Sequence, residues 1–369
     1  MTNTPDQEHS PLTLDELRQA IDRIDDGIHD LLMERAQRVQ QVGALKERGA
    51  GDISFYRPER EAHIHRRLEA RHRGPLPMAA LHRIYREIIS ASLNLERKLA
   101  VVYLGPEATF THQAAIKQFG SSPLVFPVRT IDEVFHEVEL RRADFGVTPI
   151  ENSTEGMVNH TLDRLVDSPL RIWGEIYLPV THDLLSRERD LDAIRVVYGQ
   201  PTVLAQCQTW LDNHLPHVII KECASTAAAV WEARQESGAA VIACELAADP
   251  YEWNRLVQHI EDKADNENRF LVIGRETPAR SGQDKTSLMF SFRDQPGFLH
   301  QVLGIFARRE LNLTRIESRP SLKKAWDYLF FIDLEGHQED PPVAAALAEL
   351  AATPGVVMKI LGSYPRKVL

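Results

Sequence analysis

The stretch ADFGVTPI, residues 143–150, is a short apolar run followed by polar residues, which is the pattern of a buried strand. Four similar runs occur in the middle of the chain, with helical segments between them: LAVVYLG (99–105), VVYGQ (196–200), GAAVIAC (238–244) and RFLVIG (269–274). Alternating strands and helices predict a sheet covered by helices. Residues 100–276 are therefore expected to form an α/β domain.

The residues before this domain carry only helical patterns. Thr13 and Glu16 form a capping box at the start of a helix expected over 13–49. The apolar residues of this helix recur at spacings of three and four: Leu14, Leu17, Ile21, Ile24, Ile28 and Leu31. Two more helices are expected over 58–72 and 78–98. Residues 10–98 are thus predicted to be all-α, with a long helix whose apolar seam needs a partner.

The C-terminal part follows a third pattern, after a polar linker at 275–285. Its segments run strand, helix, strand, strand, helix, strand: TSLMFSF (286–292), FLHQVLGIFARR (298–309), LNLTRIESR (311–319), WDYLFFIDLE (326–335), PPVAAALAEL (341–350) and VVMKIL (356–361). This βαββαβ order predicts a ferredoxin-like sandwich over residues 286–366.

Composition excludes several classes of function. The 369 residues carry a net charge of −10, which argues against nucleic acid as the main partner. The three cysteines form no CxxC pair and no metal-binding spacing, as expected in a reducing compartment. The polar start MTNTPDQEHSP has no apolar core of a signal peptide, and no apolar run is long enough to cross a membrane. We therefore expect a cytoplasmic protein.

Two cations of the long helix are spaced to bind one anion. Arg35 and Lys46 are eleven residues apart, which is about three turns and roughly 16 Å along the axis, so both project from one face. Arg18 lies about 42 Å from Lys46 along the same axis and cannot share a ligand with it. If Arg18 is functional, it must serve a site that another chain completes.

This helical segment resembles the chorismate mutase domain that is fused to prephenate dehydratase in bifunctional P-proteins. The matching residues are Arg18 in LRQAIDRID, Arg35 in LLMERAQ, Lys46 in VGALKERG, Arg60 and Glu61 in RPEREA, and Ser92 and Glu96 in IISASLNLE. The resemblance implies a homodimer or homotetramer with intertwined long helices, in which Arg18 reaches the active site of the partner.

The resemblance also implies roles for these residues in rearranging chorismate to prephenate. Arginines grip carboxylates in a bidentate manner, and chorismate carries two, so the substrate-binding set is Arg18, Arg35, Arg57, Arg60 and Ser92. Lys46 and Glu96 would donate to the ether oxygen on which charge builds, and Glu61 would hold the ring hydroxyl.

Two positions of this domain depart from relatives. Residue 96 is Glu, where well-known bacterial members have Gln, and a carboxyl group donates a hydrogen bond only when it is protonated. Mutase activity is therefore expected to fall as pH rises. Residue 57 is Arg, where some relatives have Asp near the hydroxyl, so the role of Arg57 is open.

The middle domain resembles prephenate dehydratase along its whole length. The matching segments are YLGPEATFT (103–111), GVTPIENSTEGMVNHTLD (146–163), GEIYLPVTHDLL (174–185), AQC (205–207), STAAA (225–229), HIEDKADN (259–266) and RFLVIG (269–274). The resemblance implies a two-lobed α/β fold like that of periplasmic binding proteins, with prephenate bound between the lobes and converted to phenylpyruvate.

The resemblance assigns polar residues to the cleft between these lobes. The catalytic set is Thr109, Glu151, Asn152, Gln206 and Asn268, and the substrate-binding set is Thr111, Ser225, Thr226, Arg269 and Phe270. Taken singly, each Thr or Ser also fits the role of a helix cap or a turn residue. The enzyme has to bind two carboxylates and help the hydroxyl to leave, because aromatisation drives the reaction.

Several cleft positions depart from the family pattern. Ala108 replaces the second glycine of the first loop, Gly199 and Gln200 replace a Ser and a His, and Asn268 stands where the family has the Thr that assists loss of the hydroxyl. An asparagine amide donates a hydrogen bond but is no practical proton donor at neutral pH. Three interpretations stay open: dehydration assisted by Asn268 or another group, decarboxylation without loss of the hydroxyl, or a silent amino-acid-sensing module.

The C-terminal unit resembles the ACT regulatory domain of the same family, which binds phenylalanine between two chains. The implied effector residues are Glu317, Ser318, Arg319 and Pro320, which read ESRP, and Pro296, Gly297, Phe298 and Leu299, where the family usually reads Gly-Ala-Leu-Val. The bulky Phe298 would narrow the pocket or change its preference, and a purely structural dimerisation domain is the alternative.

Together these patterns predict a bifunctional enzyme of phenylalanine biosynthesis with three domains: an all-α mutase, a two-lobed α/β dehydratase and a ferredoxin-like ACT domain. Chorismate and prephenate are the expected substrates and phenylalanine the expected allosteric effector. Neither reaction requires a metal or an organic cofactor, because the first is a rearrangement and aromatisation drives the second.

Overall fold

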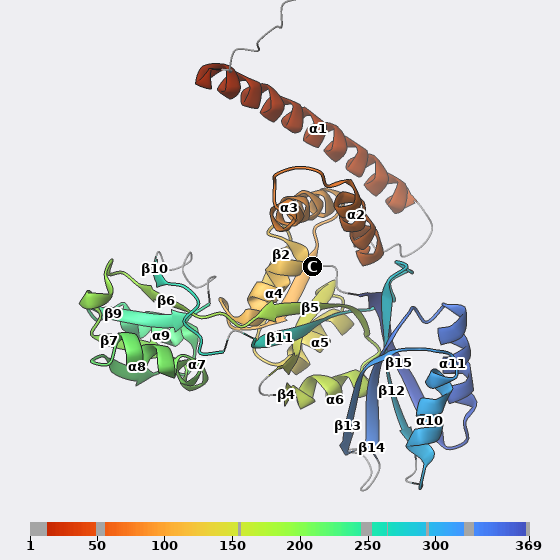
Figure 1. Cartoon of the computed structure of the whole chain (residues 1–369). Helices are drawn as coiled ribbons and strands as arrows, with labels where there is room; N and C mark the ends of the chain where they lie inside the picture. Colours follow the sequence, from red (N-terminus) through yellow and green to blue (C-terminus); the bar gives the residue numbers. More distant parts are fainter. Residues whose placement is uncertain are drawn as a thin grey trace, which may run out of the picture. The chain divides into compact units, whose positions relative to one another are not determined.

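The computed structural model describes residues 13–48, 56–153, 156–244, 253–263, 265–292, 295–320 and 328–366 (Figure 1). The described chain divides into two compact units, one made of residues 13–48 with Ser92–Lys98, and the other of Tyr56–Ala91 with residues 99–366. No helix of these described segments is long and apolar enough to cross a membrane.

The first unit is dominated by the helix α1 (Leu14–Arg48), drawn in red in Figure 1. The predicted capping box is confirmed: the Thr13 amide donates to Glu16 Oε2 at 2.8 Å, and the Glu16 amide donates to Thr13 Oγ1 at 3.3 Å. The apolar seam of α1 is exposed, with Leu14 63%, Ile24 61% and Leu31 67% accessible to solvent. The helix α3 (Met78–Glu96) contributes its last residues to this unit.

The second unit begins with α2 (Pro58–Arg71) and the first part of α3. Both helices agree with the sequence prediction. Within this unit α2 is tied to the C-terminal half of the chain, because Arg66 donates to the carbonyl of Ser281 at 2.5 Å and α2 packs against β15 (Val356–Pro365).

The first sheet has the strand order β2-β1-β3-β11-β5, with β4 paired to β3. β1 is parallel to β2 and β3, whereas β11 is antiparallel to its neighbours β3 and β5. Its strands are β1 (Ala100–Leu104), β2 (Leu124–Val128), β3 (Phe145–Asn152), β4 (Gly156–Met157), β5 (Arg171–Pro179) and β11 (Glu267–Gly274), and its helices are α4 (Phe110–Phe119), α5 (Ile131–Glu139) and α6 (Asn159–Asp167).

The second sheet has the order β10-β6-β9-β7-β8 and forms the other lobe of the domain. Its strands are β6 (Asp183–Ser186), β7 (Val196–Gly199), β8 (Ile219–Glu222), β9 (Ala239–Ala243) and β10 (Asn254–Val257); its helices are α7 (Pro201–Gln206), α8 (Gln208–His214), α9 (Thr226–Ala233) and the short 3₁₀ helix η1 (Leu191–Ala193). The predicted two-lobed α/β fold is confirmed.

Two chain crossings connect the lobes, between β5 and β6 and between β10 and β11. They are held side by side by backbone hydrogen bonds, from the Ile260 amide to the carbonyl of His182 at 2.8 Å and from the Val180 amide to the carbonyl of Asn266 at 2.8 Å. The lobes also touch where Cys244 Sγ lies 3.3 Å from the carbonyl oxygen of Ala108. Residues of the connecting segments therefore lie next to both lobes.

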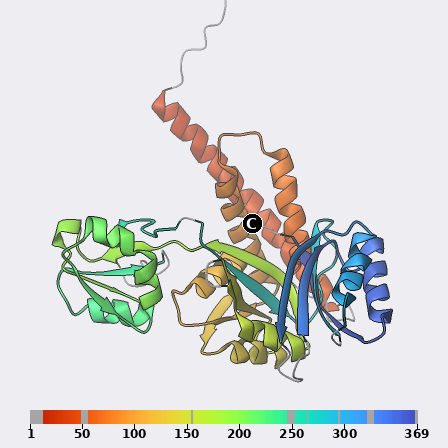
Figure 2. The ribbon, with the colours of Figure 1, turned by 60° about the horizontal axis from the view of Figure 1, so that its bottom comes forward.

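The third sheet confirms the predicted βαββαβ unit. Its order is β13-β14-β12-β15, and its elements are β12 (Asp284–Phe292), α10 (Phe298–Ala307), β13 (Leu313–Pro320), β14 (Tyr328–Glu335), α11 (Pro341–Ala352) and β15. Figures 1 and 2 show α10 and α11 on one face of this sheet. The expected linker at 275–285 ends earlier than predicted, because Asp284 and Lys285 belong to β12 and are buried.

The opposite face of the third sheet shares a hydrophobic core with the first lobe. Met289, Phe331 and Leu361 lie in one cluster with Leu165 of α6 and Ile172 of β5. The contact is closest at Gly362, where a Cβ atom would lie 2.3 Å from the carbonyl oxygen of Ile172. Only glycine fits this approach of two backbones, so the C-terminal sheet is packed against the first lobe rather than tethered to it.

Candidate functional site

Four predicted mutase residues meet in two pairs inside the first unit. Lys46 Nζ of α1 lies 2.6 Å from Glu96 Oε2 of α3, and both side chains are largely buried, with 17% and 10% exposed. Three turns earlier on α1, Arg35 donates through Nη1 to Ser92 Oγ. The pairs lie along one face of α1, as the eleven-residue spacing predicts. The structure therefore places two cations and two polar acceptors along one wall.

The other predicted mutase residues have different partners. Arg18 is exposed near the start of α1, beside Asp15 at 3.7 Å. Arg57 caps the N-terminus of α2 through its backbone, and Arg60 is exposed in the next turn. Glu61 is 5% exposed and accepts a hydrogen bond from Tyr56 Oη at 3.0 Å. Binding roles for these residues stay predictions.

The predicted lyase residues of β3 and β11 are divided between the two faces of the first sheet. Asn152 Nδ2 donates to Asn268 Oδ1 at 2.8 Å, and these residues are direct neighbours across the strands. Glu151 is paired with Arg269 in the same register. Successive side chains of a strand point to opposite faces. The Asn pair and the Glu–Arg pair therefore cannot face one cleft together.

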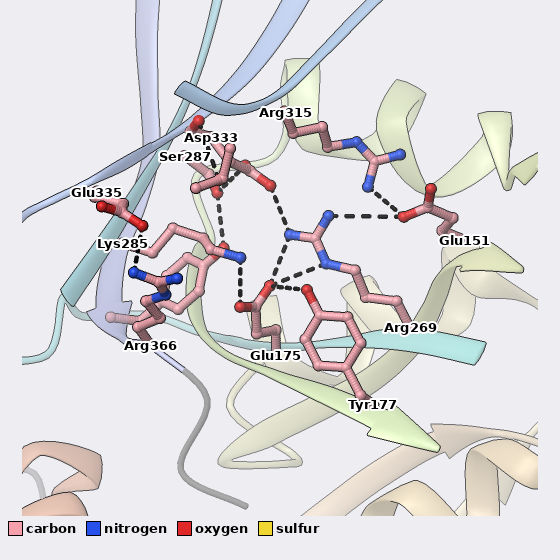
Figure 3. Close-up of polar contacts among 12 residues, drawn as sticks. Glu151, Glu175, Tyr177, Arg269, Lys285, Ser287, Arg315, Asp333, Glu335 and Arg366 are labelled. Atoms are coloured by element: carbon pink, nitrogen blue, oxygen red, sulfur yellow. Dashed lines mark hydrogen bonds and ion pairs between the residues drawn. The ribbon is translucent and has the colours of Figure 1, made fainter. Parts of the chain in front are cut away.

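Arg269 is surrounded by carboxylates of the protein. Its side chain is 7% exposed, and its guanidinium contacts Glu175 Oε2 at 2.8 Å and Asp333 Oδ2 at 2.7 Å (Figure 3). The physical reason is that the third sheet covers this face of β11 and supplies Asp333. Phe270 is buried as well, at 2% exposure. Contact of Arg269 or Phe270 with substrate stays a prediction.

The ions around Arg269 form a closed network between the first and third sheets (Figure 3). Lys285 Nζ lies 2.5 Å from Glu175 Oε1, and Ser287 Oγ donates to Asp333 Oδ1 at 2.5 Å. Arg315 of β13 pairs with Glu151 Oε2. Beside the network is a polar pocket of about 400 Å³, lined by Glu151, Tyr177, Arg269, Lys285, Asp333 and residues 314–317.

Burial and charge perturb the groups of this network in opposite directions. Burial alone would raise the pKa of Asp333, but the charge of Arg269 and the hydrogen bond from Ser287 outweigh it and hold the pKa below its usual value. Burial, followed by the charge of Glu175, raises the pKa of the Tyr177 phenol. Asp333 is thus held as a carboxylate and Tyr177 as a hydroxyl that donates to Glu175 at 3.1 Å.

The predicted Thr and Ser residues lie at two helix N-termini, one in each lobe. Thr109 Oγ1 caps α4 by accepting from the His112 amide, and Ser225 Oγ caps α9 by accepting from the Ala228 amide at 3.1 Å. Thr111 and Thr226 follow in the first turns. Helix N-termini favour anions such as carboxylates. The N-termini of α4 and α9, and not only the hydroxyl groups that cap them, are therefore able to bind a carboxylate.

The first-lobe loop is strained where it departs from the family pattern. Ala108 has a φ of 59°, in the left-handed region that favours glycine. Its methyl group packs into the core of the second lobe with Tyr198 and Cys223. The side chain thus gains apolar contact between the lobes at the cost of backbone strain.

Gln206 lies at the chain crossing between the lobes. Its Oε1 is 2.7 Å from Nε2 of His182, which is 1% exposed. Burial lowers the pKa of His182, so the ring is neutral and donates to Gln206. The His182 amide donates to Glu261 Oε2 at 2.8 Å. Gln206 is thereby tied to both connecting segments.

The predicted effector residues lie in two places of the third sheet unit. Gly297 (φ 78°) precedes α10, and Phe298 is buried in the domain core with its ring 4.5 Å from that of Phe292. The expected effect of Phe298 on an effector pocket stays a prediction. In the ESRP segment at the end of β13, Arg319 reaches α6, where it contacts Asp163 Oδ1 at 2.6 Å.

The chain matches three protein-family models, one after another: chorismate mutase type II over residues 17–97, prephenate dehydratase over 101–278 and the ACT domain over 286–352. A bifunctional chorismate mutase/prephenate dehydratase of Aquifex aeolicus is 47% identical over 360 residues, covering 96% of this chain and 99% of the relative. The chain belongs to the family of bifunctional chorismate mutase/prephenate dehydratases. The likeness extends through all three parts of the chain.

Solved structures support the fold of the dehydratase and ACT parts of this family member. A prephenate dehydratase from Arthrobacter aurescens in complex with L-Phe has a TM-score of 0.65 at 35% identity, covering 73% of this chain and 90% of its own. A quorum-quenching acylase, GqqA, has the same TM-score at 27% identity, with 73% of this chain and 98% of its own covered. The fold alone therefore does not fix the chemistry.

Sequence reasoning missed three network residues of this bifunctional protein. Glu175, Lys285 and Asp333 lie inside strands and are buried. Charged residues are almost never fully buried without a partner. An isolated charge within the apolar stretches GEIYLPV and LFFIDLE was therefore a signal of a buried ion pair.

Proposed function

We propose that this chain catalyses two consecutive reactions, the rearrangement of chorismate to prephenate and the conversion of prephenate to phenylpyruvate with loss of CO₂ and water. The single observation that carries the proposal is the full-length likeness to a bifunctional chorismate mutase/prephenate dehydratase, 47% identical over 96% of the chain. We further propose domain boundaries at residues 10–98, 100–276 and 286–366.

The proposed mutase site uses the two pairs between α1 and α3. Arg35 binds a carboxylate of chorismate, and Ser92 orients that guanidinium. Lys46 donates to the ether oxygen as its bond breaks, and the protonated carboxyl of Glu96 is the second donor. No nucleophile is needed, because the reaction only redistributes bonds within chorismate.

The proposed site is completed by a second copy of this chain. The exposed apolar seam of α1 needs a cover, and an identical helix offers the same spacing of apolar residues. Arg18 then reaches the site of the partner, since it lies about 42 Å from Lys46 of its own helix. A homodimer or a homotetramer satisfies this requirement.

The proposed lyase site lies on the Asn152–Asn268 face of the first sheet, between the lobes. Helix N-termini of α4 and α9 bind the carboxylates of prephenate. The Asn268 Nδ2 group, which takes no part in the bond from Asn152 to Asn268 Oδ1, donates to the departing hydroxide and stabilises it. The ring carboxylate leaves as CO₂, its bonding electrons enter the ring, and hydroxide leaves from the opposite ring carbon to be protonated to water. Aromatisation drives the step.

One experiment separates the proposed lyase from its alternatives. The protein is incubated with chorismate, and the products are identified by mass and absorbance. Phenylpyruvate supports the proposal, a dihydro-hydroxyphenylpyruvate indicates decarboxylation alone, and accumulated prephenate indicates a silent lyase domain. Accumulated chorismate contradicts the mutase assignment.

Phenylalanine is the proposed effector of the third sheet unit. An ACT model matches residues 286–352, and the similar structure from Arthrobacter aurescens is a complex with L-Phe. We place the binding residues at 296–299 and at Glu317–Pro320, as the sequence motifs suggest.

A cytoplasmic location is proposed for this chain. The three cysteines are buried and free of disulfides, which suits a reducing compartment. Cell fractionation with an antibody to the chain tests the location, and recovery with a membrane or exported fraction contradicts it.

A further inference from the structure

Three cations of the third sheet converge on one segment of the lyase domain, residues 151–168. Arg315 pairs with Glu151 at the end of β3. Arg319 donates to the carbonyl of Asn159 at 2.8 Å and contacts Asp163 at 2.6 Å on α6. Lys359 donates to three carbonyls at the C-terminus of the same helix, at 2.6 to 3.0 Å. This segment begins inside the PIENSTEG motif (residues 149–156), so the third sheet contacts that motif directly at Glu151.

Glu151 is the residue of this segment that connects both sides. It is held by Arg315 from β13 and faces Arg269 of β11, whose Nη1 lies 3.8 Å away. Arg269 is already shared by Glu175 and Asp333 at 2.8 and 2.7 Å. Arg315 is therefore the main cation available to Glu151, as Figure 3 shows.

The position of Glu151 determines that of its neighbour Asn152. Both residues belong to the last two positions of β3, where the ladder to β11 has a register shift between Arg269 and Phe270. A shifted ladder is locally disrupted and constrains the strand less than a regular one. Side-chain contacts of Glu151 thus contribute more to fixing this strand end than they would in a regular sheet.

We propose that Arg315 is a positioning residue of the lyase reaction, which acts through Glu151 to hold Asn152 and Asn268 in register. The inference rests on the proposed lyase function and deepens it, because it gives the C-terminal unit a role in turnover. Without Arg315, Glu151 turns to water or pulls Arg269 from Glu175 and Asp333. Either change moves the end of β3, and a displacement of about 1 Å at a reacting group can cost a hundredfold in rate.

The test compares Arg315→Met with wild type in the full-length protein. Arg308→Met is the matched control, because Arg308 lies in the same domain, is exposed and pairs with Glu349 at 2.6 Å. We expect Arg315→Met to lower kcat for product formation from prephenate about ten- to a hundredfold, with KM changed less than threefold. Arg308→Met keeps the wild-type kcat, and thermal melts of both variants report that they fold.

A double mutant distinguishes positioning from a general loss of structure. If Arg315 acts through Glu151, the variant Arg315→Met with Glu151→Gln is no slower than Glu151→Gln alone. Arg315→Lys restores part of the rate, since it returns a cation to the pair. The proposal is overturned if the loss of kcat in the double mutant equals the product of the losses in the two single variants. It is also overturned if Arg315→Met keeps the wild-type kcat.

A second readout keeps this test separate from the proposed function. Hydrogen exchange of backbone amides is measured in peptides covering 145–152 and 267–274. We expect faster exchange in Arg315→Met than in Arg308→Met. If wild type yields no product from prephenate, the lyase proposal fails, and exchange then tests only whether Arg315 holds the end of β3. Faster exchange supports that contact, and unchanged exchange overturns it.

Discussion

Asn152 and Asn268 are joined side chain to side chain across two antiparallel strands, with Asn152 Nδ2 donating to Asn268 Oδ1 at 2.8 Å. This contact fixes which end of the Asn268 amide faces away from Asn152. The group turned away is an N–H donor, which stabilises negative charge without transferring a proton at neutral pH.

Removing the Asn268 donor is expected to slow the lyase. Asn268→Ala should lower kcat from prephenate about a hundredfold, which is the typical effect of deleting one donor to a developing anion. Asn268→Thr should keep phenylpyruvate as the product, since a hydroxyl also donates there. Product analysis and initial rates check both variants. A wild-type rate for Asn268→Ala would show that the leaving group is assisted elsewhere.

Lys46 is expected to be essential for the first reaction alone. Lys46→Ala should lower the mutase rate about 10²- to 10³-fold and leave the lyase rate with added prephenate unchanged. Arg38→Ala is the control on α1, because the Arg38 side chain is exposed and its ion pair with Glu34, at 3.8 Å, is exposed as well. Equal losses in both variants would indicate damage to the helix rather than loss of a donor.

Glu96 is expected to give the mutase a pH dependence. A carboxyl group donates a hydrogen bond only in its protonated form. The wild-type rate should fall as pH rises, and Glu96→Gln, whose amide donates at every pH, should give a flat profile. Rates from pH 5 to 9 on both proteins make the comparison. A flat wild-type profile contradicts the assignment.

Asp333 is expected to make the second unit sensitive to acid. Its folded pKa lies below the unfolded value of 3.8, so its contribution to stability is present above about pH 4 and is lost as pH falls through the folded pKa. Asp333→Asn removes one of the two buried carboxylates that pair with Arg269, the other being Glu175, and should cost about 3–5 kcal/mol at pH 7. Urea unfolding at pH 7 and below pH 4 measures both effects. The control Glu349→Gln should change little, because its carboxylate pairs with Arg308 and Arg309 near the surface.

Assembly through α1 is expected to be necessary for mutase activity. Ile24→Glu places a charge in the apolar seam, and should lower both the mass measured by light scattering and the mutase rate. Gln19→Glu, on the opposite side of the helix, is the control. An Ile24→Glu protein that keeps the wild-type mass and rate would exclude the seam as the subunit contact.

L-Phenylalanine is expected to inhibit the lyase and raise the melting temperature, because a ligand that binds the folded state stabilises it. Millimolar L-phenylalanine is compared with D-phenylalanine in thermal melts and in prephenate turnover. No change in either measurement would leave the third sheet unit without an effector role.

Much of the fold follows from local patterns of the sequence. The capping box at Thr13 and the βαββαβ order appear as predicted, because both depend on residues close in the chain. The strand expected at ADFGVTPI is shifted toward the C-terminus, since β3 begins at Phe145 and extends to Asn152, and the strand at RFLVIG is longer than expected, since β11 begins at Glu267. Their polar ends are paired with each other, and such pairing is not visible in either segment alone.

The site was predicted less completely than the fold. A motif places Glu151 next to Asn152 and Asn268 next to Arg269, but strand geometry sends neighbours to opposite faces. Which face is buried depends on how the third sheet packs, and no local pattern contains that information. The buried charges Glu175 and Asp333 indicate that each has a partner of opposite charge. That partner, Arg269, lies 94 residues from Glu175 in the sequence, so local patterns do not identify it.

The close approach at Gly362 bears on how this protein can be recombined. Because the backbone of β15 lies against Ile172, a regulatory unit taken from a relative has to bring a glycine at this position and cations equivalent to Arg315, Arg319 and Lys359. Without these residues, a chimera joined in the linker after Gly274 would pack a third sheet against a first lobe that is not complementary to it. The exchangeable module of this enzyme is therefore the regulatory sheet together with the lyase lobe beneath it.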